Sequence, residues 1–160
     1  MTLPQHARTK QLMSIDQFEG AQGKERLADA LLSHELVGHN QALARKFADE
    51  AVVVEFKSGQ TLLKQHDPAS HVYLVLSGEV SVEVNGTRVT TSGPGVPIGE
   101  IALLDPSGGR SASVIAIAHT IVARVTQAQF EALAKEYPQV WHGVARHLAR
   151  HVRRHNARYQ

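Results

Sequence analysis

The spacing of apolar residues along the chain changes twice. From Lys24 to residue 48, leucines, alanines and one phenylalanine recur at helical intervals, which predicts two short helices. Between residues 51 and 125, short β-branched runs alternate with glycine-containing turns, a pattern typical of strands. Helical spacing returns after Thr126, and Pro138 is well placed to open a last helix. The chain is therefore expected to fold as helices, then strands, then helices.

The strand-rich middle of the chain predicts a closed β structure. Asn85-Gly86, between Ser81–Val84 and Thr87–Thr91, is a strong hairpin signal, because a type I′ turn needs positive φ at both central residues. About eight such strands follow one another with no helix between them. This arrangement favours a mainly β (α+β) fold, an eight-stranded antiparallel β jelly roll flanked by short N-terminal helices and C-terminal helices.

The length of 160 residues suits one domain. Residues 1–22 show little periodicity and are interpreted as an N-terminal arm without predicted order. Residues 23–160 form the predicted domain. Its parts are helices over residues 24–48, a jelly roll over residues 51–125 and helices over residues 127–158.

Composition excludes several classes of protein. Apolar residues make up 42% of the chain and charged residues 20%, as in ordinary globular proteins. The absence of cysteine rules out disulfides, thiolate metal sites and cysteine nucleophiles. No apolar stretch approaches the roughly 20 residues of a membrane span, and residues 1–10 lack the apolar run of a signal peptide. We expect a soluble, cytoplasmic protein with no membrane partner.

The positive charge is concentrated at the C-terminus. Residues 138–160 contain five arginines and no carboxylate, which leaves 12 basic and 15 acidic residues, a net charge of −3, on residues 1–137. Arginines on one segment can contact nucleic acid, but there is no aromatic interleaving and no recognition helix. We therefore interpret the segment as a solvated basic helix and expect no nucleic-acid partner.

The candidate chemistry lies in residues 94–112, which read PGVPIGEIALLDPSGGRSA. Gly99 allows the backbone to approach a ligand closely, and the amides that follow it can point at an anion if they form one helical turn. Arg110 can donate a forked pair of hydrogen bonds to phosphate oxygens. Glu100 can accept from a sugar hydroxyl. These residue types suit a ribose phosphate, whereas the alternative is a structural salt bridge or two exposed loop charges.

Four pieces of the chain together resemble the cyclic-nucleotide-binding domain shared by the catabolite activator protein and the regulatory subunits of protein kinase A. Their order and spacing match over about residues 40–155. The pieces are Phe56–Gly59, Tyr73–Gly78, Gly99–Leu104 and Arg110–Ala112.

The resemblance implies a role for each matching residue. Glu100 would bind the ribose 2′-hydroxyl, Arg110 the cyclic phosphate, and Ser111 would add a hydroxyl to the same phosphate. The backbone would complete the phosphate site through Gly99, Ile101 and Ala102. The implied ligand is a 3′,5′-cyclic mononucleotide, either cAMP or a cyclic pyrimidine, cUMP or cCMP. Binding would draw a helical lid, residues 127–158, over the pocket and so signal to an output domain or partner.

The chain also departs from the family. A transcription factor of this family would continue into a helix-turn-helix, but the sequence stops at Gln160. The layout resembles the sensor of Pycsar-type antiphage effectors, in which a toxic TIR or membrane domain follows. We therefore expect a C-terminal effector domain beyond residue 160.

Two features of the last helix allow more than one interpretation. His147, His151 and His155 lie at helical spacing and could bind a metal, but the segment supplies no carboxylate partner, so we favour a solvated basic face and expect no metal. The stripe of Val140, Val144, Leu148 and Val152 either packs on the barrel or forms the seam of a weak homodimer, which we expect. Trp141 has two possible roles that the sequence does not separate: it anchors the core or it covers the base of the ligand.

The sequence offers no catalytic signature. It contains no His-x-His pair for a cupin metal site, no Gly-x-Ser-x-Gly elbow and no Walker loop. We expect a sensor without enzymatic activity or cofactor. The alternative function is a ligand-independent dimerisation or interaction module on the same fold.

Overall fold

The N-terminal part of the protein is more regular than the sequence pattern predicts. The structure, a computed structural model, describes residues 13–105 and 108–157, so most of the predicted arm lies outside the described residues. The arm's last residues contain the 3-10 helix η1 (Ile15–Phe18), and α2 (Gly20–Leu32) begins four residues before Lys24. Gly23 allows this early start, because a Cβ there would lie 2.2 Å from the backbone of Phe18. The division into an arm and one domain stays a prediction.

In the part of the chain that the structure describes, eight antiparallel strands form two four-stranded sheets, which confirms the predicted mainly β fold with helices at its ends. One sheet has the order β1-β8-β3-β6 and the other β2-β7-β4-β5. The strands are β1 (Val52–Phe56), β2 (Thr61–Leu63), β3 (His71–Ser77), β4 (Val80–Val84), β5 (Thr87–Ser92), β6 (Pro97–Ile98), β7 (Ser113–Ala116) and β8 (Thr120–Thr126).

The hairpin between β4 and β5 has the predicted turn. Asn85 and Gly86 both have positive φ, at 52° and 80°, and Val84 pairs with Thr87. By contrast, the sequence pattern did not single out β6, because two residues show no alternation. Tyr73 and Leu74 of β3 pair with β6, and this pairing holds the start of the candidate site against the sheet.

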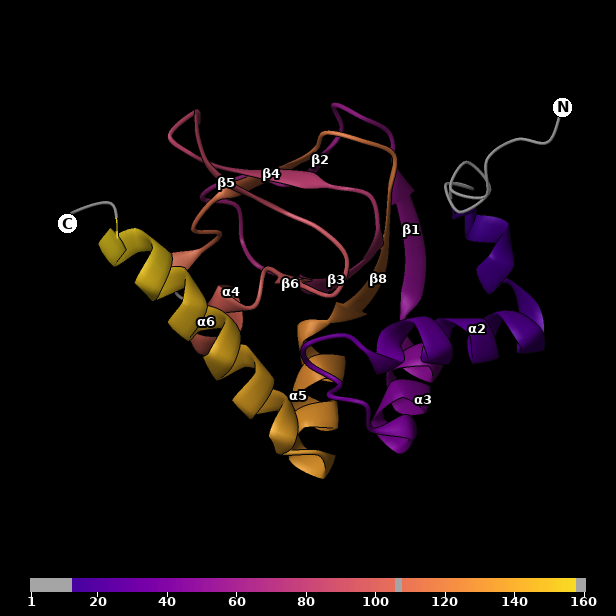
Figure 1. Ribbon diagram of the computed structural model, residues 1–160. Helices are drawn as coiled ribbons and strands as arrows, with labels where there is room; N and C mark the ends of the chain where they lie inside the picture. Colours follow the sequence, from indigo (N-terminus) through magenta and orange to yellow (C-terminus); the bar gives the residue numbers. More distant parts are fainter. Residues whose placement is uncertain (1–12, 106–107, 158–160) are drawn as a thin grey trace, which may run out of the picture.

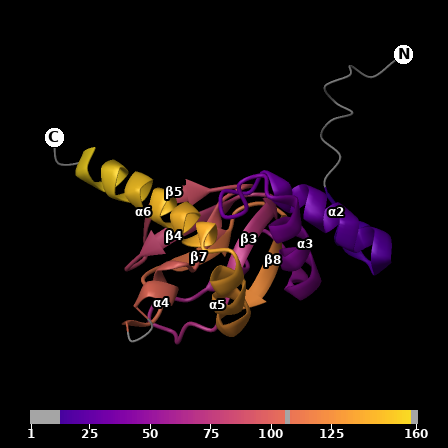
Figure 2. The same ribbon diagram turned by 90° about the horizontal axis from the view of Figure 1, so that it is seen from below.

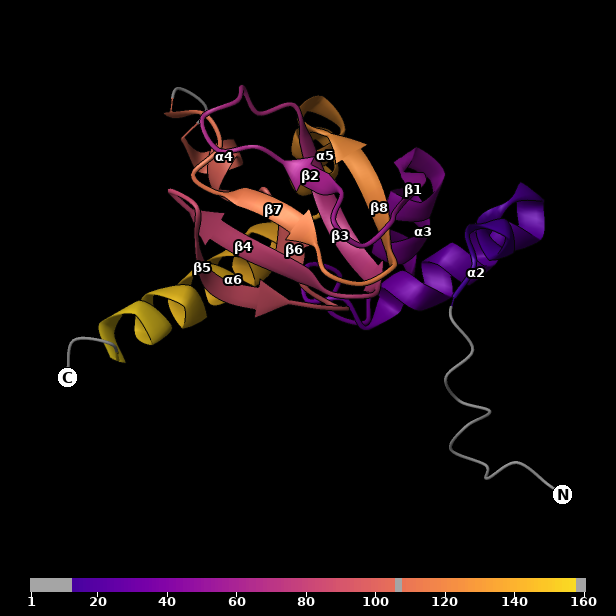
Figure 3. The ribbon, with the colours of Figure 1, turned by 90° about the horizontal axis from the view of Figure 1, so that it is seen from above.

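Helices close one end of the sheets and one side. Figure 1 shows α2, α3 (Gln41–Glu50) and α5 (Gln127–Glu136) gathered at the end of the sheets, while α6 (Gln139–Ala157) runs from α5 past α4 (Ile101–Leu104). Figures 2 and 3 show that α6 and α2 lie on opposite sides of the molecule, with the outer end of α6 beyond the strands. The first half of α6 therefore lies among the helices, and its second half extends past α4.

Two apolar cores share one wall. The sheet that contains β3 and β8 packs on one face against the helices, through residues such as Val72, Leu74, Phe47 and Phe130. Its other face packs against the second sheet, through residues such as Tyr73, Val75, Val114 and Val122. Burial on both faces explains why β3 reads as a continuous apolar run in the sequence rather than as an alternating one.

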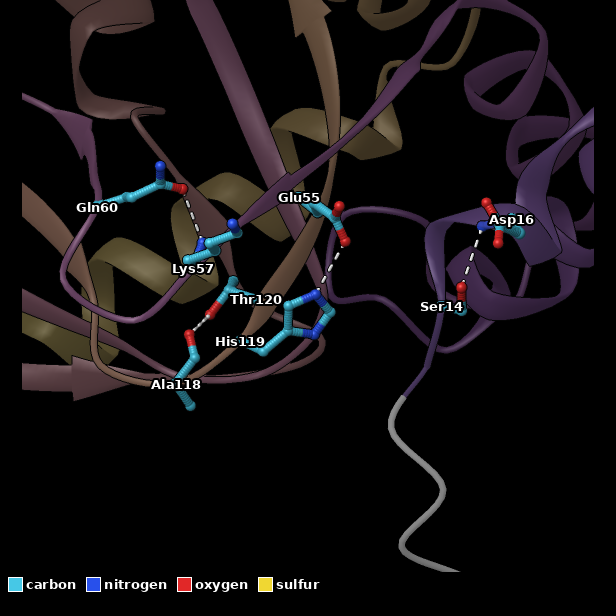
Figure 4. A network of polar contacts seen from close by, with 8 residues as sticks. All are labelled: Ser14, Asp16, Glu55, Lys57, Gln60, Ala118, His119 and Thr120. Carbon is cyan, nitrogen blue, oxygen red and sulfur yellow. Dashed lines mark hydrogen bonds and ion pairs between the residues drawn. The ribbon is translucent and has the colours of Figure 1, made fainter.

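Short polar contacts fix the turns at the far end of the barrel (Figure 4). His119 Nε2 lies 2.9 Å from Glu55 Oε2 and so ties the β7–β8 turn to β1. Thr120 donates its hydroxyl proton to the carbonyl of Ala118, and Gln60 accepts from the backbone N–H of Lys57. These contacts lie among turns and strand ends, and none of these residues lines the two cavities of the candidate site.

His34 is a buried histidine in the loop between α2 and α3. Its side chain is almost inaccessible, and Nδ1 accepts a hydrogen bond from the N–H of Leu36 at 3.2 Å. Burial lowers the pKa of His34 to about 4; the backbone of Val96 opposes this shift and the nearby His147 adds to it. The neutral ring is therefore the form that the fold accommodates.

The buried neutral state of His34 predicts an acid-sensitive fold. Between pH 6.5 and about 4 the unfolded chain binds a proton at this ring that the folded chain does not, so stability falls as the pH falls through that window. The free energy of unfolding should fall by about 3 kcal/mol across this pH range. Chemical denaturation across this pH range should show a smaller loss for His34→Gln than for the wild type, whereas the exposed control His142→Gln should match the wild type. Equal losses in all three proteins would contradict the assignment.

Candidate ligand-binding site

A glycine at position 99 brings two distant parts of the chain together. Gly99 has φ +87°, and a Cβ there would lie 2.5 Å from Nη1 of Arg110. The following turn, α4, directs the backbone away from β6 immediately after this contact. A left-handed conformation and the absence of a side chain are both required here, so the residue before Glu100 has to be glycine.

Glu100 and Arg110 are both buried, at 4% and 5% exposure. Arg110 donates from Nη2 to the carbonyl of His71 at 2.7 Å and from Nη1 to the carbonyl of Gly99 at 3.3 Å. Burial lowers the pKa of Arg110 from its usual value, while Tyr73 and Glu100 oppose the shift. The guanidinium stays charged, since arginine does not deprotonate in proteins, and it is held by two backbone carbonyls.

A cavity of about 80 Å³ lies between this segment and α6. An adjoining cavity of about 400 Å³ shares several of its lining residues, among them Val82, Thr90 and Ser111. Five of the six predicted residues line the smaller cavity: Gly99, Glu100, Ile101, Arg110 and Ser111. The sixth, Ala102, lies in the α4 turn. The structure therefore brings the predicted site residues together.

The last helix supplies lining residues that the sequence pattern did not assign to the site. His147, His151 and Arg154 of α6 line the smaller cavity. Their spacing of four and three residues places them on one face of the helix. This periodicity is the feature of the sequence that indicates a shared environment for the three side chains. Of the predicted lid, residues 127–158, the described part contains α5 and α6, and α6 supplies residues that line the cavity, while the role as a lid stays a prediction.

The interpretation of the three histidines as a solvated basic face is wrong for His147. Its side chain is only 12% exposed, and its two ring nitrogens face carboxylates from outside the helix: Nδ1 lies 3.4 Å from Glu35 and Nε2 lies 3.3 Å from Glu100. His151 and His155 are exposed. The carboxylates that residues 138–160 lack come from the loop between α2 and α3 and from Glu100, the residue before α4, and residue spacing within one helix cannot reveal them.

The first half of α6 is fixed to the protein body. Val140 and Val144 are buried in the core that joins the helices, and a Cβ on Gly143 would lie 2.8 Å from the carbonyl oxygen of Glu35. Trp141 packs edge-on against Phe130, with ring centroids 5.6 Å apart, and lines neither cavity. It is therefore a core anchor in this structure.

Within residues 13–105 and 108–157, no three His, Asp or Glu side chains converge in an arrangement that could hold a metal ion. Among the helices of the same residues, none combines the length and the apolar character that crossing a bilayer requires.

The comparisons with known proteins agree with this geometry. The family model described as the cyclic nucleotide-binding domain matches residues 53–137. The match covers more than half of the chain, so the protein belongs to the cyclic nucleotide-binding domain family, as the sequence resemblance indicated.

Two curated Pycsar effector proteins are similar to this chain. It is 38% identical to the Pycsar effector protein XpPycTIR of Xanthomonas perforans, over 84% of this chain and 45% of the relative. It is 39% identical to PaPycTIR of Pseudomonas aeruginosa, over 84% and 44%. The chain thus spans less than half the length of these curated relatives.

Two solved structures show the shared fold. The catabolite activator protein of Thermus thermophilus superimposes with a TM-score of 0.68 at 28% identity, over 78% of this chain and 61% of that chain. The regulatory domain of Toxoplasma gondii PKA, solved with cAMP, gives a TM-score of 0.69 at 23% identity, over 79% and 50%.

The contact between Gly99 and Arg110 predicts the effect of adding one methyl group. Gly99→Ala and Gly95→Ala both place a side chain at positive φ, which should cost about 1–2 kcal/mol of unfolding free energy each. A Cβ at position 95 meets nothing within 4 Å, whereas one at position 99 displaces the guanidinium. Gly99→Ala should lose roughly a further 1–3 kcal/mol of unfolding free energy, because the displaced guanidinium breaks the hydrogen bonds that Arg110 donates to backbone carbonyls. Equal losses in urea denaturation would contradict this account.

Proposed function

We propose that this protein is a regulatory sensor domain that binds a 3′,5′-cyclic mononucleotide in the cavity under α6. One observation carries the proposal: two buried groups of opposite charge, Glu100 and Arg110, line one cavity beside the α4 turn. A buried charge costs free energy unless it is paired or hydrogen-bonded. A ligand that carries both an anion and sugar hydroxyls can bind Arg110 through the anion and Glu100 through a hydroxyl. No catalytic role is proposed for this domain.

The phosphate would bind at Arg110. The hydrogen bonds to His71 and Gly99 hold the guanidinium in place and occupy two of its five N–H groups. The remaining donors, the backbone amides of Ile101 and Ala102 and the hydroxyl of Ser111 would bind the phosphate oxygens. Ser111 and Ile101 line both cavities, which supports their place between the phosphate and the rest of the ligand.

The ribose would bind at Glu100. An ionised carboxylate only accepts hydrogen bonds, so it suits a sugar hydroxyl and opposes a phosphate oxygen. This difference would orient the ligand, with the cyclic phosphate toward Arg110 and the ribose 2′-hydroxyl toward Glu100. The base would then extend into the adjoining cavity of about 400 Å³. We propose cAMP or a cyclic pyrimidine nucleotide, cUMP or cCMP, as the ligand.

The signal would pass through α6. His151 and Arg154 of this helix border both cavities, so an anionic ligand would favour the position of α6 over the site. A ligand that binds this position better than others shifts the population toward it. The Pycsar relatives are longer than this chain, which supports a further effector domain as the recipient of the signal.

The proposal predicts a base-selective stabilisation that depends on Arg110. The midpoint of thermal unfolding should rise when cAMP, cGMP, cCMP or cUMP is added well above the micromolar range, and one base should give the largest rise. Arg110→Ala should remove the rise, because the site loses a charged, forked hydrogen-bond donor. The affinity for the ligand should fall by at least about 100-fold.

Arg146→Ala is the matched control for this measurement. Arg146 is exposed on α6 and lines neither cavity, so its removal should preserve the rise. If no cyclic nucleotide shifts the wild type, or if Arg110→Ala binds as tightly as the wild type, the assignment of the site fails. A ligand-independent interaction module would then be the better hypothesis.

A second candidate, self-association, rests on the outer part of the apolar stripe. Val140 and Val144 are buried within the protein, but Val152 is 55% exposed. The part of the stripe available to a second copy is therefore short, which fits a weak homodimer rather than a stable one. Val152→Asp should lower the fraction of dimer in sedimentation velocity at high protein concentration, with no change in the ligand-induced shift. A wild-type protein that stays monomeric at millimolar concentration would exclude this candidate.

A further inference from the structure

We propose that Glu35 is a latch that holds α6 closed and thereby sets the affinity for the ligand without touching it. The inference rests on the proposed function and concerns a residue outside residues 53–137, the part that the family model matches. Glu35 lines neither cavity, and it lies in the loop between α2 and α3. Its role would be that of a positioning residue.

The loop that carries Glu35 is a firm part of the protein body. The N–H of Glu35 donates to the carbonyl of Gly95 at 3.1 Å, and Gly95 in turn donates to the carbonyl of Val75 in β3. The next residues, Leu36 and Val37, are 1% exposed and belong to the helix-side core. The carboxylate of Glu35 is thus presented from a fixed backbone that is tied to the sheet.

This carboxylate contacts α6 at two positions one turn apart. Its Oε1 forms an ion pair with Arg150, and its Oε2 lies 3.4 Å from Nδ1 of His147. The side chain of Glu35 is only 11% exposed, which makes its ion pair with Arg150 stronger than one between fully solvated charges. Because each oxygen has its own partner, both contacts can form at once.

His147 connects the latch to the candidate site. Its other nitrogen, Nε2, lies 3.3 Å from Oε1 of Glu100, the carboxylate proposed to bind ribose. The chain of contacts therefore runs from Glu35 through His147 to Glu100, and α6 is the element in the middle. The side chains of Glu100 and His147 are 6% and 12% exposed, so little solvent separates the members of this chain.

Most of the outer half of α6 is exposed to solvent. Leu148 is partly buried, but residues 149–157 are exposed, including the cavity-lining His151 and Arg154. In the proposed latch, the contacts of His147 and Arg150 with Glu35 help to keep these two side chains over the cavity. Loss of Glu35 would leave His147 and Arg150 without their common partner and allow this half of the helix to move away.

The first test measures ligand binding to Glu35→Gln, which keeps the size of the side chain and removes its charge. With whichever of cAMP, cGMP, cCMP or cUMP stabilises the wild type most, the dissociation constant should rise roughly tenfold, mainly through faster dissociation. The matched control is Glu25→Gln, on the exposed face of α2, which should bind as the wild type does. An affinity within twofold of the wild type, or tighter, would overturn the latch.

A double-mutant cycle tests the route of the effect. If Glu35 acts through α6, then Glu35→Gln and Arg150→Gln should not be additive: the double variant should bind about as weakly as Glu35→Gln alone. Independent effects that multiply would show that Glu35 influences the site in another way and would overturn the proposed route.

The second test needs no ligand, so its failure is separate from failure of the proposed function. The chain has no cysteine, so spin labels can be placed on Thr87→Cys in β5 and Arg153→Cys in α6, both exposed positions. Glu35→Gln should broaden the distribution of distances between these labels, whereas Glu25→Gln should not. An unchanged distribution would overturn the latch even if the wild type binds a cyclic nucleotide.

Discussion

A buried guanidinium must find partners for its N–H groups, and the arrangement around Arg110 meets this constraint. The carbonyls of His71 and Gly99 accept from it, and each comes from a different part of the chain. His71 is fixed by the pairing of β3 with β8, and Gly99 by the short pairing of β3 with β6. The register of one sheet therefore determines where the positive charge of the site lies, and the burial of Glu100 beside it follows from the same backbone path.

The elements that are long and periodic could be predicted from the sequence. The helix over residues 41–50, the β4–β5 hairpin and the strand β3 each carry their signal within their own residues, as helical spacing, an Asn-Gly turn or a continuous apolar run. The six candidate site residues were also found in this way, because they lie in two short motifs at family spacing. Their function remains a prediction, but the location of five of them around one cavity does not depend on it.

The features that the sequence did not reveal depend on contacts between distant residues. The strand β6 is too short to show a pattern and exists because β3 offers an edge beside it. The start of α2 depends on the close approach of Gly23 to Phe18. Glu35 and His147 are 112 positions apart in the numbering, and nothing in either local sequence indicates that they meet. Charge counted along the C-terminal helix suggested a solvated face, whereas the partner charges come from elsewhere in the fold.

The sheet formed by β1, β8, β3 and β6 is apolar on both faces, whereas the outer half of α6 is exposed. Opening of a protein is rarely uniform, since regions with many buried contacts open at higher free energy than regions with few. The two-sided wall belongs to the first kind and the exposed half of α6 to the second. Under the proposed mechanism, the helix would leave the cavity and return while the sheets stay folded. Exchange of the proposed ligand would then need no unfolding of the sheets.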